Sequence, residues 1–242
     1  MENNEELKGW TIPVLDKGYV RLIDWHGSDQ RVLEFARISY GSSSKGDEAD
    51  KKLIEYLWKN RHSSPFEAIK ITLNIKMPIF VMRQYVRHRM QNLNEVSARY
   101  SELPEEFYIP KAWRPQDTKN KQGSIATENW NPLTEIYEDK SQMSATRLLE
   151  EHSRVSYETY QALLDAGVAR EMARMVLPVN IYTEIYTTWD MKNLLHFITL
   201  REDSHAQAEI VEYAKAIKEM CEKLFPWVMT AFSKYKFQLV EI

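Results

Sequence analysis

Apolar and polar side chains alternate without a break between Ile69 and Lys76, and no other segment limits the choice of fold as strongly. Residues two apart in a strand lie on the same face of the sheet, so this strand has one aliphatic face and one polar face. Strands of a parallel sheet are apolar on both faces, whereas antiparallel strands commonly have one packed face and one polar face. The segment 66–76 is therefore predicted to be a half-buried strand of an antiparallel sheet.

Two further segments have strand-like sequences, and the chain between the strands carries apolar residues at helical spacing. With 242 residues the chain can bury a sizeable core, and no break in composition marks a second domain. We expect an α+β fold in which a central, mostly antiparallel sheet is flanked by long helices, with residues 1–242 in a single domain. Strands are predicted at 19–25, 66–76 and 181–189, and helices at 28–38, 47–61, 78–87, 136–166, 169–176, 191–202 and from 204 onwards.

Capping residues mark where several of these helices begin. Ser28 and Asp190 are predicted N-caps, because a short polar side chain can accept a hydrogen bond from a free N–H group of the first turn. Ser204 and Gln207 have the spacing of a capping box, in which each side chain bonds the backbone N–H of the other residue. The polar run 91–95 is predicted to be a loop.

The composition excludes several kinds of nucleotide site. With only seven glycines the chain contains neither a dinucleotide-binding fingerprint nor a P-loop, so side chains would have to hold a nucleotide. The one cysteine excludes an internal disulfide and a cysteine-based metal cluster, which fits a reducing, cytoplasmic environment, and no metal site is predicted. The acidic first residues lack the apolar stretch of a signal peptide, and no run of about 18 apolar residues predicts a membrane span.

Positive charge is concentrated in residues 83–100. Four arginines against one glutamate give this stretch a local charge of +3, whereas the whole chain has a formal net charge of −3. A compact cationic patch on an acidic chain favours a small anionic ligand over a nucleic acid, which needs positive charge spread over a face. In a helix that starts after Pro78, Arg83 and Arg87 lie one turn apart and could hold a phosphate through paired hydrogen bonds. The alternative is a solvated basic turn.

Arg201 lies on an otherwise apolar helix face. In the predicted helix 191–202 it shares that face with Leu194, Phe197 and Ile198. A guanidinium group on such a face is costly unless a partner or a ligand meets it. Arg201 is therefore a candidate ligand-binding residue.

Four motifs resemble those of one enzyme family. Arg87-His88-Arg89, seven residues and then Ser97 resemble the signature of the flavin-dependent thymidylate synthases. That family methylates dUMP to dTMP with methylenetetrahydrofolate, NADPH and FAD. The resemblance therefore implies FAD as cofactor, NADPH and methylenetetrahydrofolate as co-substrates, and a homotetramer with its sites between subunits. The other three motifs are His-Ser-Ser-Pro-Phe-Glu at 62–67, Arg-x-Val-Leu-Pro at 174–178 and Leu-Arg-Glu-Asp-Ser-His-Ala-Gln at 200–207.

The resemblance also implies a role for individual residues. Arg201 would contact and polarise the pyrimidine ring, which makes it the expected catalytic residue. The residues implied for dUMP binding are Gln84, Arg87, Glu95, Ser97, Arg99, Arg174 and Arg201. Those implied for binding FAD and folate are Ser39, His62, Ser64, Glu67, Arg87, His88, Arg89, Asp190, Lys192 and His196.

Structural roles stay open for several of these residues. Ser39 could bond its own backbone at a helix end, and His62 could cap a helix. Arg170 and Arg174 could each form an ordinary surface ion pair with a glutamate. The family often has asparagine and arginine at two of the flavin positions, which are Asp190 and Lys192 in this chain.

Cys221 belongs to a stripe of apolar residues at helical spacing and is predicted to be a small buried hydrophobe. The stripe would face either the core or another subunit. Ordinary thymidylate synthases attack the uracil ring with an exposed thiolate beside a base or a cation, and this chain offers no such cysteine. Methylation would then need another route, and a flavin provides one. The stripe consists of Ile210, Ala214, Ile217, Cys221 and Leu224.

The segment 111–132 is rich in Asn, Gln, Lys and Thr, has few aliphatic residues and is predicted to be a mobile flap.

Two other functions compete with the enzyme. A nucleic-acid binding module could use the arginines of 83–99, but the negative net charge of the chain argues against it. A flavoprotein that only oxidises NADPH would share the flavin site and lack the pyrimidine contacts.

Overall fold

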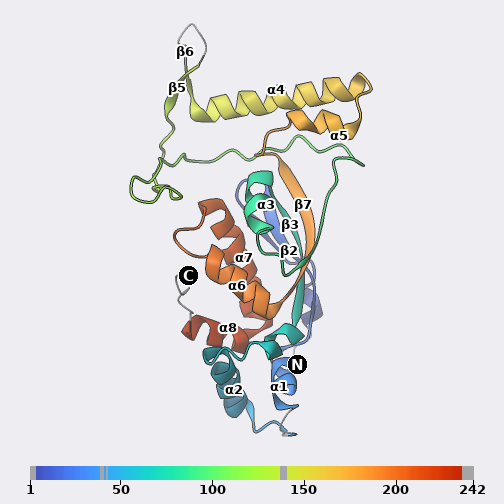
Figure 1. Ribbon diagram of the computed structural model, residues 1–242, viewed down its shortest axis with the longest axis vertical. Coiled ribbons are helices and arrows are strands. Elements are labelled where there is room, and N and C mark those ends of the chain that lie inside the picture. The colour runs from blue at the N-terminus through green and yellow to red at the C-terminus, as the bar shows by residue number, and fades with distance from the viewer. Residues whose placement is uncertain (1–3, 39–40, 42, 137–140, 236–242) are drawn as a thin grey trace.

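The computed structural model describes residues 4–38, 41, 43–136 and 141–235. A central sheet lies beside a group of helices, and the long helix α4 crosses one end of the molecule (Figure 1). Among the described residues no helix is both long enough and apolar enough to cross a membrane. The elements are η1 (Asn4–Leu7), β1 (Thr11–Val14), β2 (Gly18–His26), α1 (Asp29–Arg37), α2 (Asp47–Lys59), η2 (Ser64–Ala68), β3 (Lys70–Pro78), α3 (Ile79–Tyr85), β4 (Asn92–Glu95), β5 (Leu133–Ile136), β6 (Ser141–Ser144), α4 (Ala145–Asp165), α5 (Arg170–Ala173), η3 (Arg174–Val176), β7 (Tyr182–Asp190), α6 (Met191–Arg201), α7 (Ala208–Leu224) and α8 (Pro226–Lys234).

The main sheet has the strand order β1-β2-β3-β7-β4 within the described residues, and every neighbouring pair is antiparallel. β3 is the central strand and pairs with β7 along its whole length, beginning with Lys70 opposite Asp190. Ile71, Leu73 and Ile75 are fully buried, so the alternation in the sequence identified the packed face correctly. The α+β fold on a mostly antiparallel sheet is confirmed.

The C-terminal helices pack on the aliphatic face of this sheet. α7 lies against β1 and β2, α6 lies against α7, and α8 packs against both α7 and α2. The apolar stripe of α7, with Cys221 in it, is buried in this core. Fully burying an aliphatic side chain contributes about 1.5–3 kcal/mol, so the stripe anchors α7 to the sheet of its own subunit. It is a core face.

Two predicted segments have a different structure. Residues 66–68 belong to the short helix η2 and not to the strand, because Pro65 occupies the first turn of that helix. Residues 92–95 form the strand β4 and not a loop. β4 is an edge strand and pairs only with β7 among the described elements, which explains why its sequence is polar.

The helix predicted at 136–166 begins nine residues later than expected. Residues 133–136 and 141–144 form the antiparallel hairpin β5–β6, and 137–140 lie outside the described residues. α4 starts at Ala145 because the Ser144 hydroxyl accepts a hydrogen bond from the Arg147 N–H group and caps the first turn. Its C-terminal end agrees with the prediction.

The predicted caps have mixed outcomes. The Asp190 carboxylate caps α6 by accepting a hydrogen bond from the Asn193 N–H group at 3.0 Å, as predicted. Ser28 precedes α1 as predicted, but its side chain makes no capping hydrogen bond. The prediction of a capping box at Ser204 was wrong, because the chain makes a turn at 203–206 and α7 begins only at Ala208. The elements β1 and α8 were not predicted.

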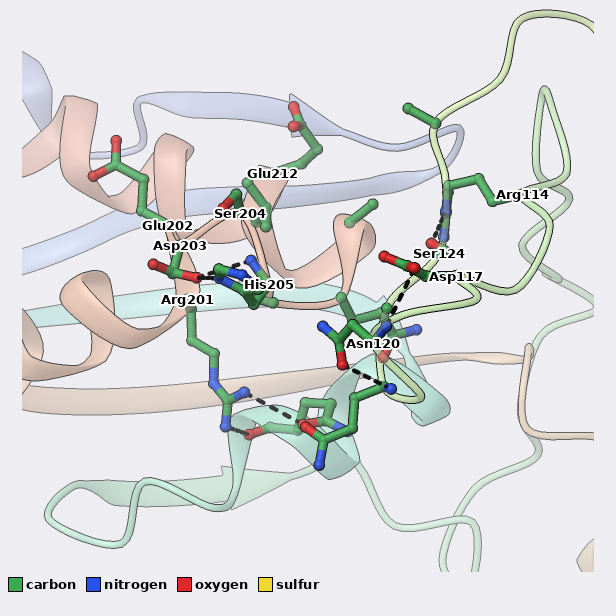
Figure 2. A pocket seen from close by; sticks show the side chains of 18 of the residues that line it. Arg114, Asp117, Asn120, Ser124, Arg201, Glu202, Asp203, Ser204, His205 and Glu212 are labelled. Carbon is green, nitrogen blue, oxygen red and sulfur yellow. Dashed lines mark hydrogen bonds and ion pairs between the residues drawn. The ribbon is translucent and has the colours of Figure 1, made fainter. Parts of the chain in front are cut away.

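The segment 111–132 is irregular and runs past the start of α7. Figure 2 shows Arg114, Asp117 and Asn120 of this segment opposite the turn between α6 and α7. Arg114 forms a 2.5 Å ion pair with Glu209 at the start of α7, and Glu209 is buried. The mobility of the segment stays a prediction.

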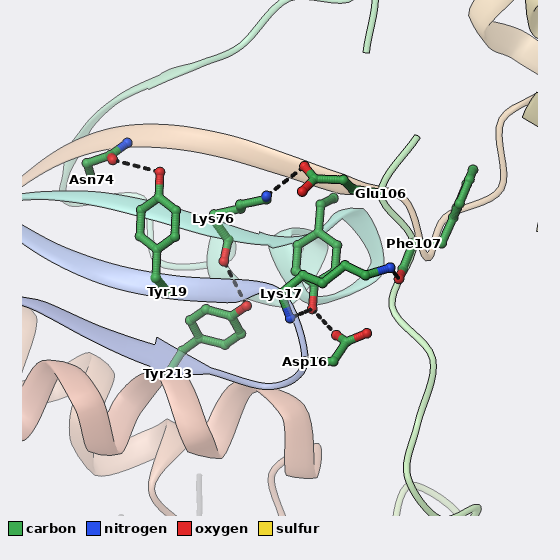
Figure 3. Close-up of polar contacts among 9 residues, drawn as sticks. Asp16, Lys17, Tyr19, Asn74, Lys76, Glu106, Phe107 and Tyr213 are labelled. Atoms are coloured by element: carbon green, nitrogen blue, oxygen red, sulfur yellow. Dashed lines mark hydrogen bonds and ion pairs between the residues drawn. The ribbon is translucent and has the colours of Figure 1, made fainter. Parts of the chain in front are cut away.

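A polar cluster ties α7 to the end of β3 (Figure 3). The Tyr213 hydroxyl donates to the Lys76 carbonyl oxygen at 2.8 Å, and the Lys76 ammonium group pairs with Glu106 at 2.6 Å. Gly18 lies directly beside this contact, since a Cβ atom there would be 2.1 Å from the Tyr213 hydroxyl oxygen. The close approach of helix and sheet therefore requires glycine at this position.

Candidate active site

Arg201 ends α6 and reaches across to α3. Its guanidinium group is half-buried, and burial lowers the pKa of Arg201 from its ordinary value. Nε donates to His88 Nε2 at 3.0 Å, while Nη1 and Nη2 lie 3.4 Å from the side-chain and backbone oxygens of Gln84. Within the described part of the chain no carboxylate pairs with Arg201. Its positive charge is therefore not paired with a negative group in the described chain, and its binding of a ligand stays a prediction.

His88 accepts the hydrogen bond from Arg201 as a neutral imidazole. Its ring packs edge-on against Phe197, with ring centroids 4.9 Å apart, and lies 6.1 Å from the ring of His196. Burial, together with the charges of Arg201 and His196, lowers the pKa of His88 to about 4. The proton of the neutral ring then lies on Nδ1, because Nε2 is the acceptor. Arg201 is therefore the charged member of this pair at neutral pH.

The arginines of the basic stretch are exposed. Arg83, Arg87 and Arg89 make no hydrogen bond or ion pair through their side chains with any residue that the structure describes. α3 ends at Tyr85, so Arg87 lies in the following turn and not on the helix, which corrects the prediction that Arg83 and Arg87 share a helical face. Three unpaired guanidinium groups close together in sequence remain a place for an anion.

Glu95, Ser97 and Arg99 lie on β4 and in the turn that follows it. Glu95 Oε1 accepts a hydrogen bond from the Thr183 hydroxyl of β7 at 2.7 Å. Ser97 Oγ accepts the Arg99 N–H group at 3.3 Å. Arg99 Nε lies 3.5 Å from Glu171 on α5. These contacts bring the end of β4 beside α5.

Arg174 follows α5 directly, on η3. Its side chain is exposed and has no ion pair among the described residues. Arg170, one turn earlier, lies 3.8 Å from Glu102. The ion-pair alternative therefore holds for Arg170 and not for Arg174.

Apart from the exposed Arg87, the residues implied for dUMP binding form two groups. The Arg201 group consists of Gln84 and Arg201, with His88 of the flavin and folate set bonded to Arg201, and the Arg174 group lies around β4, α5 and η3. No hydrogen bond or ion pair between described residues joins the two groups. The Arg174 group consists of Glu95, Ser97, Arg99 and Arg174.

His62 and Ser64 line a cavity of about 610 Å³ at the ends of α1 and α2. Phe35 and Tyr56 are part of its wall, and the Tyr56 and His62 rings meet edge-on with centroids 5.9 Å apart. Aromatic walls with a few polar groups suit a flat heteroaromatic ligand. Ser39 lies outside the described residues.

Three other residues implied for the flavin have partners within the chain. Glu67 of η2 and Lys192 of α6 form a 2.5 Å ion pair with each other at the surface. The Asp190 carboxylate accepts from both the backbone and the side-chain amide of Asn193, at 3.0 and 2.7 Å. His196 is exposed next to His88. These contacts bring η2 and the start of α6 together.

A cavity of about 860 Å³ lies between the α6–α7 turn and the segment 114–126 (Figure 2). Arg201 and Gln84 line it from one side, and Asp117 and Asn120 line it from the other. No binding role was predicted from the sequence for the second side. The amide-rich composition of this segment was the available signal, because amide side chains bind polar ligands as readily as they form turns.

Cys221 is fully buried in α7, and burial raises the pKa of its thiol above the ordinary value. It is the one cysteine of the chain. A buried thiol with a raised pKa is a poor nucleophile. The prediction of a small buried hydrophobe is confirmed.

Residues 21–227 match the family model described as thymidylate synthase complementing protein. The chain is 46% identical over 225 residues to a flavin-dependent thymidylate synthase of Thermus thermophilus, covering 93% of this chain and 79% of the relative. The enzyme of the same name from Thermotoga neapolitana is 43% identical over 227 residues, covering 94% and 96%. The solved structure of the UMP/dUMP methylase PolB from Streptomyces cacaoi, bound with 5-Br dUMP, has a TM-score of 0.78 and 32% identity, covering 93% of this chain and 98% of that one. The chain belongs to the family of flavin-dependent thymidylate synthases.

Proposed function

We propose that this enzyme methylates dUMP to dTMP, taking the carbon from methylenetetrahydrofolate and the hydride from FAD that NADPH has reduced. The observation that carries the proposal is the half-buried Arg201, which has no carboxylate partner in the described chain and lies beside a neutral His88. A positive group in a partly dry site stabilises negative charge on a bound ring far better than it would in water. We propose a cytoplasmic location for the enzyme, because its substrates would be found there.

Arg201 acts on the pyrimidine in this proposal. Its guanidinium group would favour the polarised or N3-deprotonated form of the uracil ring. Gln84 and His88 hold the guanidinium in place from the side of α3, and a neutral His88 leaves the positive charge of Arg201 uncompensated. The orientation is thus set before the substrate binds, which is what electrostatic stabilisation requires.

The Arg174 group would bind the sugar and the phosphate. Arg174 would pair with the phosphate, and Ser97 and Arg99 would hydrogen-bond the remaining polar groups of the nucleotide. Because no hydrogen bond or ion pair between described residues joins this group to the Arg201 group, we propose that each site takes one group from one subunit and the second group from another. A homotetramer with its sites between subunits meets this requirement.

FAD supplies the hydride chemistry when it is bound. The aromatic-walled cavity with His62 and Ser64 fits a flat ring system, and the exposed Arg87 and Arg89 suit its two phosphates. Glu67, Lys192 and Asp190 would form part of the wall through their existing contacts, and His88 and His196 would approach the flavin and the folate. Ser39 is proposed for the same site.

No cysteine takes part in the proposed reaction. Cys221 is buried in the core of its own subunit, and its raised pKa leaves little thiolate at neutral pH. Hydride delivery from the flavin would replace covalent attack on the uracil ring.

The absorbance spectrum of the purified protein tests this proposal. We expect the bands of oxidised flavin, bleaching on addition of NADPH, and recovery of the bands with formation of dTMP when dUMP and methylenetetrahydrofolate are added. A protein that binds no flavin and forms no dTMP under these conditions would refute the proposed reaction. Calorimetric binding of dUMP separates this enzyme from a flavoprotein that only oxidises NADPH.

A further inference from the structure

The loop 116–124 lines the same cavity of about 860 Å³ as Arg201 and Gln84. Figure 2 shows Arg201 on one side of this cavity and Asp117 and Asn120 on the other. Under the proposed function the cavity takes part of the nucleotide, because Arg201 would contact the pyrimidine. The loop is then positioned to contact the same ligand.

Hydrogen bonds within the loop hold its shape. Gln116 Nε2 lies 2.8 Å from the Gly123 carbonyl oxygen and 3.1 Å from that of Lys121. Asp117 Oδ1 accepts the N–H group of Lys119 at 2.7 Å. A loop whose shape is set before binding loses little conformational entropy when a ligand meets it.

One arginine fastens this loop to the body of the enzyme. Arg114 Nη2 lies 2.5 Å from Oε1 of Glu209, a carboxylate that is 4% exposed at the start of α7. Arg114 Nε also donates to the hydroxyl of Ser124 at 3.1 Å, at the far end of the loop. Because charge-assisted hydrogen bonds to a buried carboxylate are strong, this pair ties the loop to the start of α7.

Asn120 provides a hydrogen-bond donor that is not used within the described chain. Its side-chain oxygen accepts the Gln122 N–H group at 3.1 Å, which sets the orientation of the amide. Its Nδ2 group has no acceptor among the described residues, although the side chain is half-buried and lines the cavity. A donor that lines a cavity and has no acceptor among the described residues can hydrogen-bond a ligand there without giving up a bond within the protein.

We propose that Asn120 is a substrate-binding residue, and that its Nδ2 group donates a hydrogen bond to an acceptor oxygen of the nucleotide that Arg201 holds. This inference rests on the proposed function. Gln116 and Arg114 act as positioning residues, since their hydrogen bonds hold the loop that carries Asn120. The oxygen belongs either to the base and sugar or to the phosphate, and the chemistry of donation is the same.

Calorimetric titration of dUMP into the full-length, FAD-loaded protein tests the contact. Asn120→Asp keeps the oxygen that bonds Gln122 and replaces the donor by a second acceptor, so we expect it to weaken binding at least about 20-fold. Asn120→Ala should weaken binding about 5- to 20-fold, and Gln116→Leu should have a similar effect by releasing the loop. Lys119→Ala is the matched control on the same loop and should change Kd by less than about twofold.

The thermal midpoint of each variant should stay close to that of the wild type, because the loop is outside the core. Deoxyuridine, which has no phosphate, identifies the oxygen: the effect of Asn120→Ala persists if the base or sugar supplies it and disappears if the phosphate does. Wild-type binding of dUMP with no change in either Asn120 variant would overturn this inference and leave the proposed function intact. Failure of the wild type to bind dUMP at all would overturn both.

Discussion

Arg201 combines a cost for folding with the binding role that we propose for it. Burial lowers the pKa of its guanidinium group, yet in the described chain only neutral acceptors meet it, namely His88 and Gln84. Neutral acceptors satisfy the N–H groups without cancelling the charge. A carboxylate in place of His88 would form an ion pair with Arg201. The pair would stabilise the fold, but it would also neutralise the positive charge proposed to bind a ligand.

Replacement of Arg201 tests the catalytic role that we propose for it. We expect Arg201→Ala to lower kcat at least about a hundredfold, which corresponds to about 2.7 kcal/mol of transition-state stabilisation. Folding should be nearly unaffected, because the side chain is half-buried at the end of α6 and forms no ion pair with a described residue. Steady-state kinetics and thermal unfolding measure the two effects.

Arg170→Ala is the control for this experiment, because Arg170 forms only a surface ion pair, 3.8 Å from Glu102. Its turnover should equal that of the wild type. Arg201→Lys keeps the charge and loses the planar guanidinium group. Its turnover should lie between that of Arg201→Ala and that of the wild type. Wild-type turnover in Arg201→Ala would remove the role assigned to this residue.

Among the secondary-structure elements, α1 and α8 are joined by one carboxylate. Asp29 of α1 is buried, and its oxygens accept the Val228 and Trp227 N–H groups at 3.0 and 3.2 Å. It therefore caps the first turn of a helix that lies almost 200 residues later in the chain. Burial raises the pKa of Asp29 from 3.8 to about 6, outweighing the two hydrogen bonds, which lower it.

This raised pKa makes the stability of the fold depend on pH. Between about pH 3.8 and 6 the folded state holds a proton that the unfolded state has lost, so the contribution of Asp29 is complete below 3.8 and disappears as the pH rises through 6. The free energy of unfolding of the wild type, relative to Asp29→Asn, should be higher at pH 4 than at pH 7 by up to about 3 kcal/mol. Urea denaturation of both proteins at the two pH values measures it. An equal difference at both pH values would contradict the assignment.

Elements with regular side-chain patterns were predictable, and short or edge elements were not. β3 and β7 were recognised because alternation reports burial on one face, and α7 because its apolar stripe has helical spacing. β4 is an exposed edge strand, so its polar sequence looked like a loop. The hairpin β5–β6 is held by pairing between its two strands, which a helical pattern in one window of sequence does not reveal.

At the scale of the whole molecule, the proposed sharing of each site between two subunits predicts complementation between inactive variants. A protein with Arg201→Ala and a protein with Arg174→Ala should each be inactive. When the two chains are co-expressed and assemble at random, about a quarter of the shared sites would have both arginines, so about a quarter of wild-type activity should return. Activity assays on the purified hybrid measure this.

The control is a mixture of the two variant proteins, each purified separately and kept under conditions in which they do not exchange subunits. This mixture should stay inactive. If each site were built within one chain, every site of the hybrid would lack one arginine. An inactive hybrid that has the wild-type oligomeric state would therefore contradict the sharing of sites between subunits.

Local patterns along the chain were enough to recognise the packed face of the central strand, the need for side chains in a nucleotide site, and the family. Periodicity and motifs depend on residues close in sequence, and the sequence records these directly. The Arg201–His88 contact, the Glu67–Lys192 pair and the position of the loop 116–124 join residues far apart in the chain. They became visible only in the folded molecule, because packing of the whole core sets which distant side chains meet.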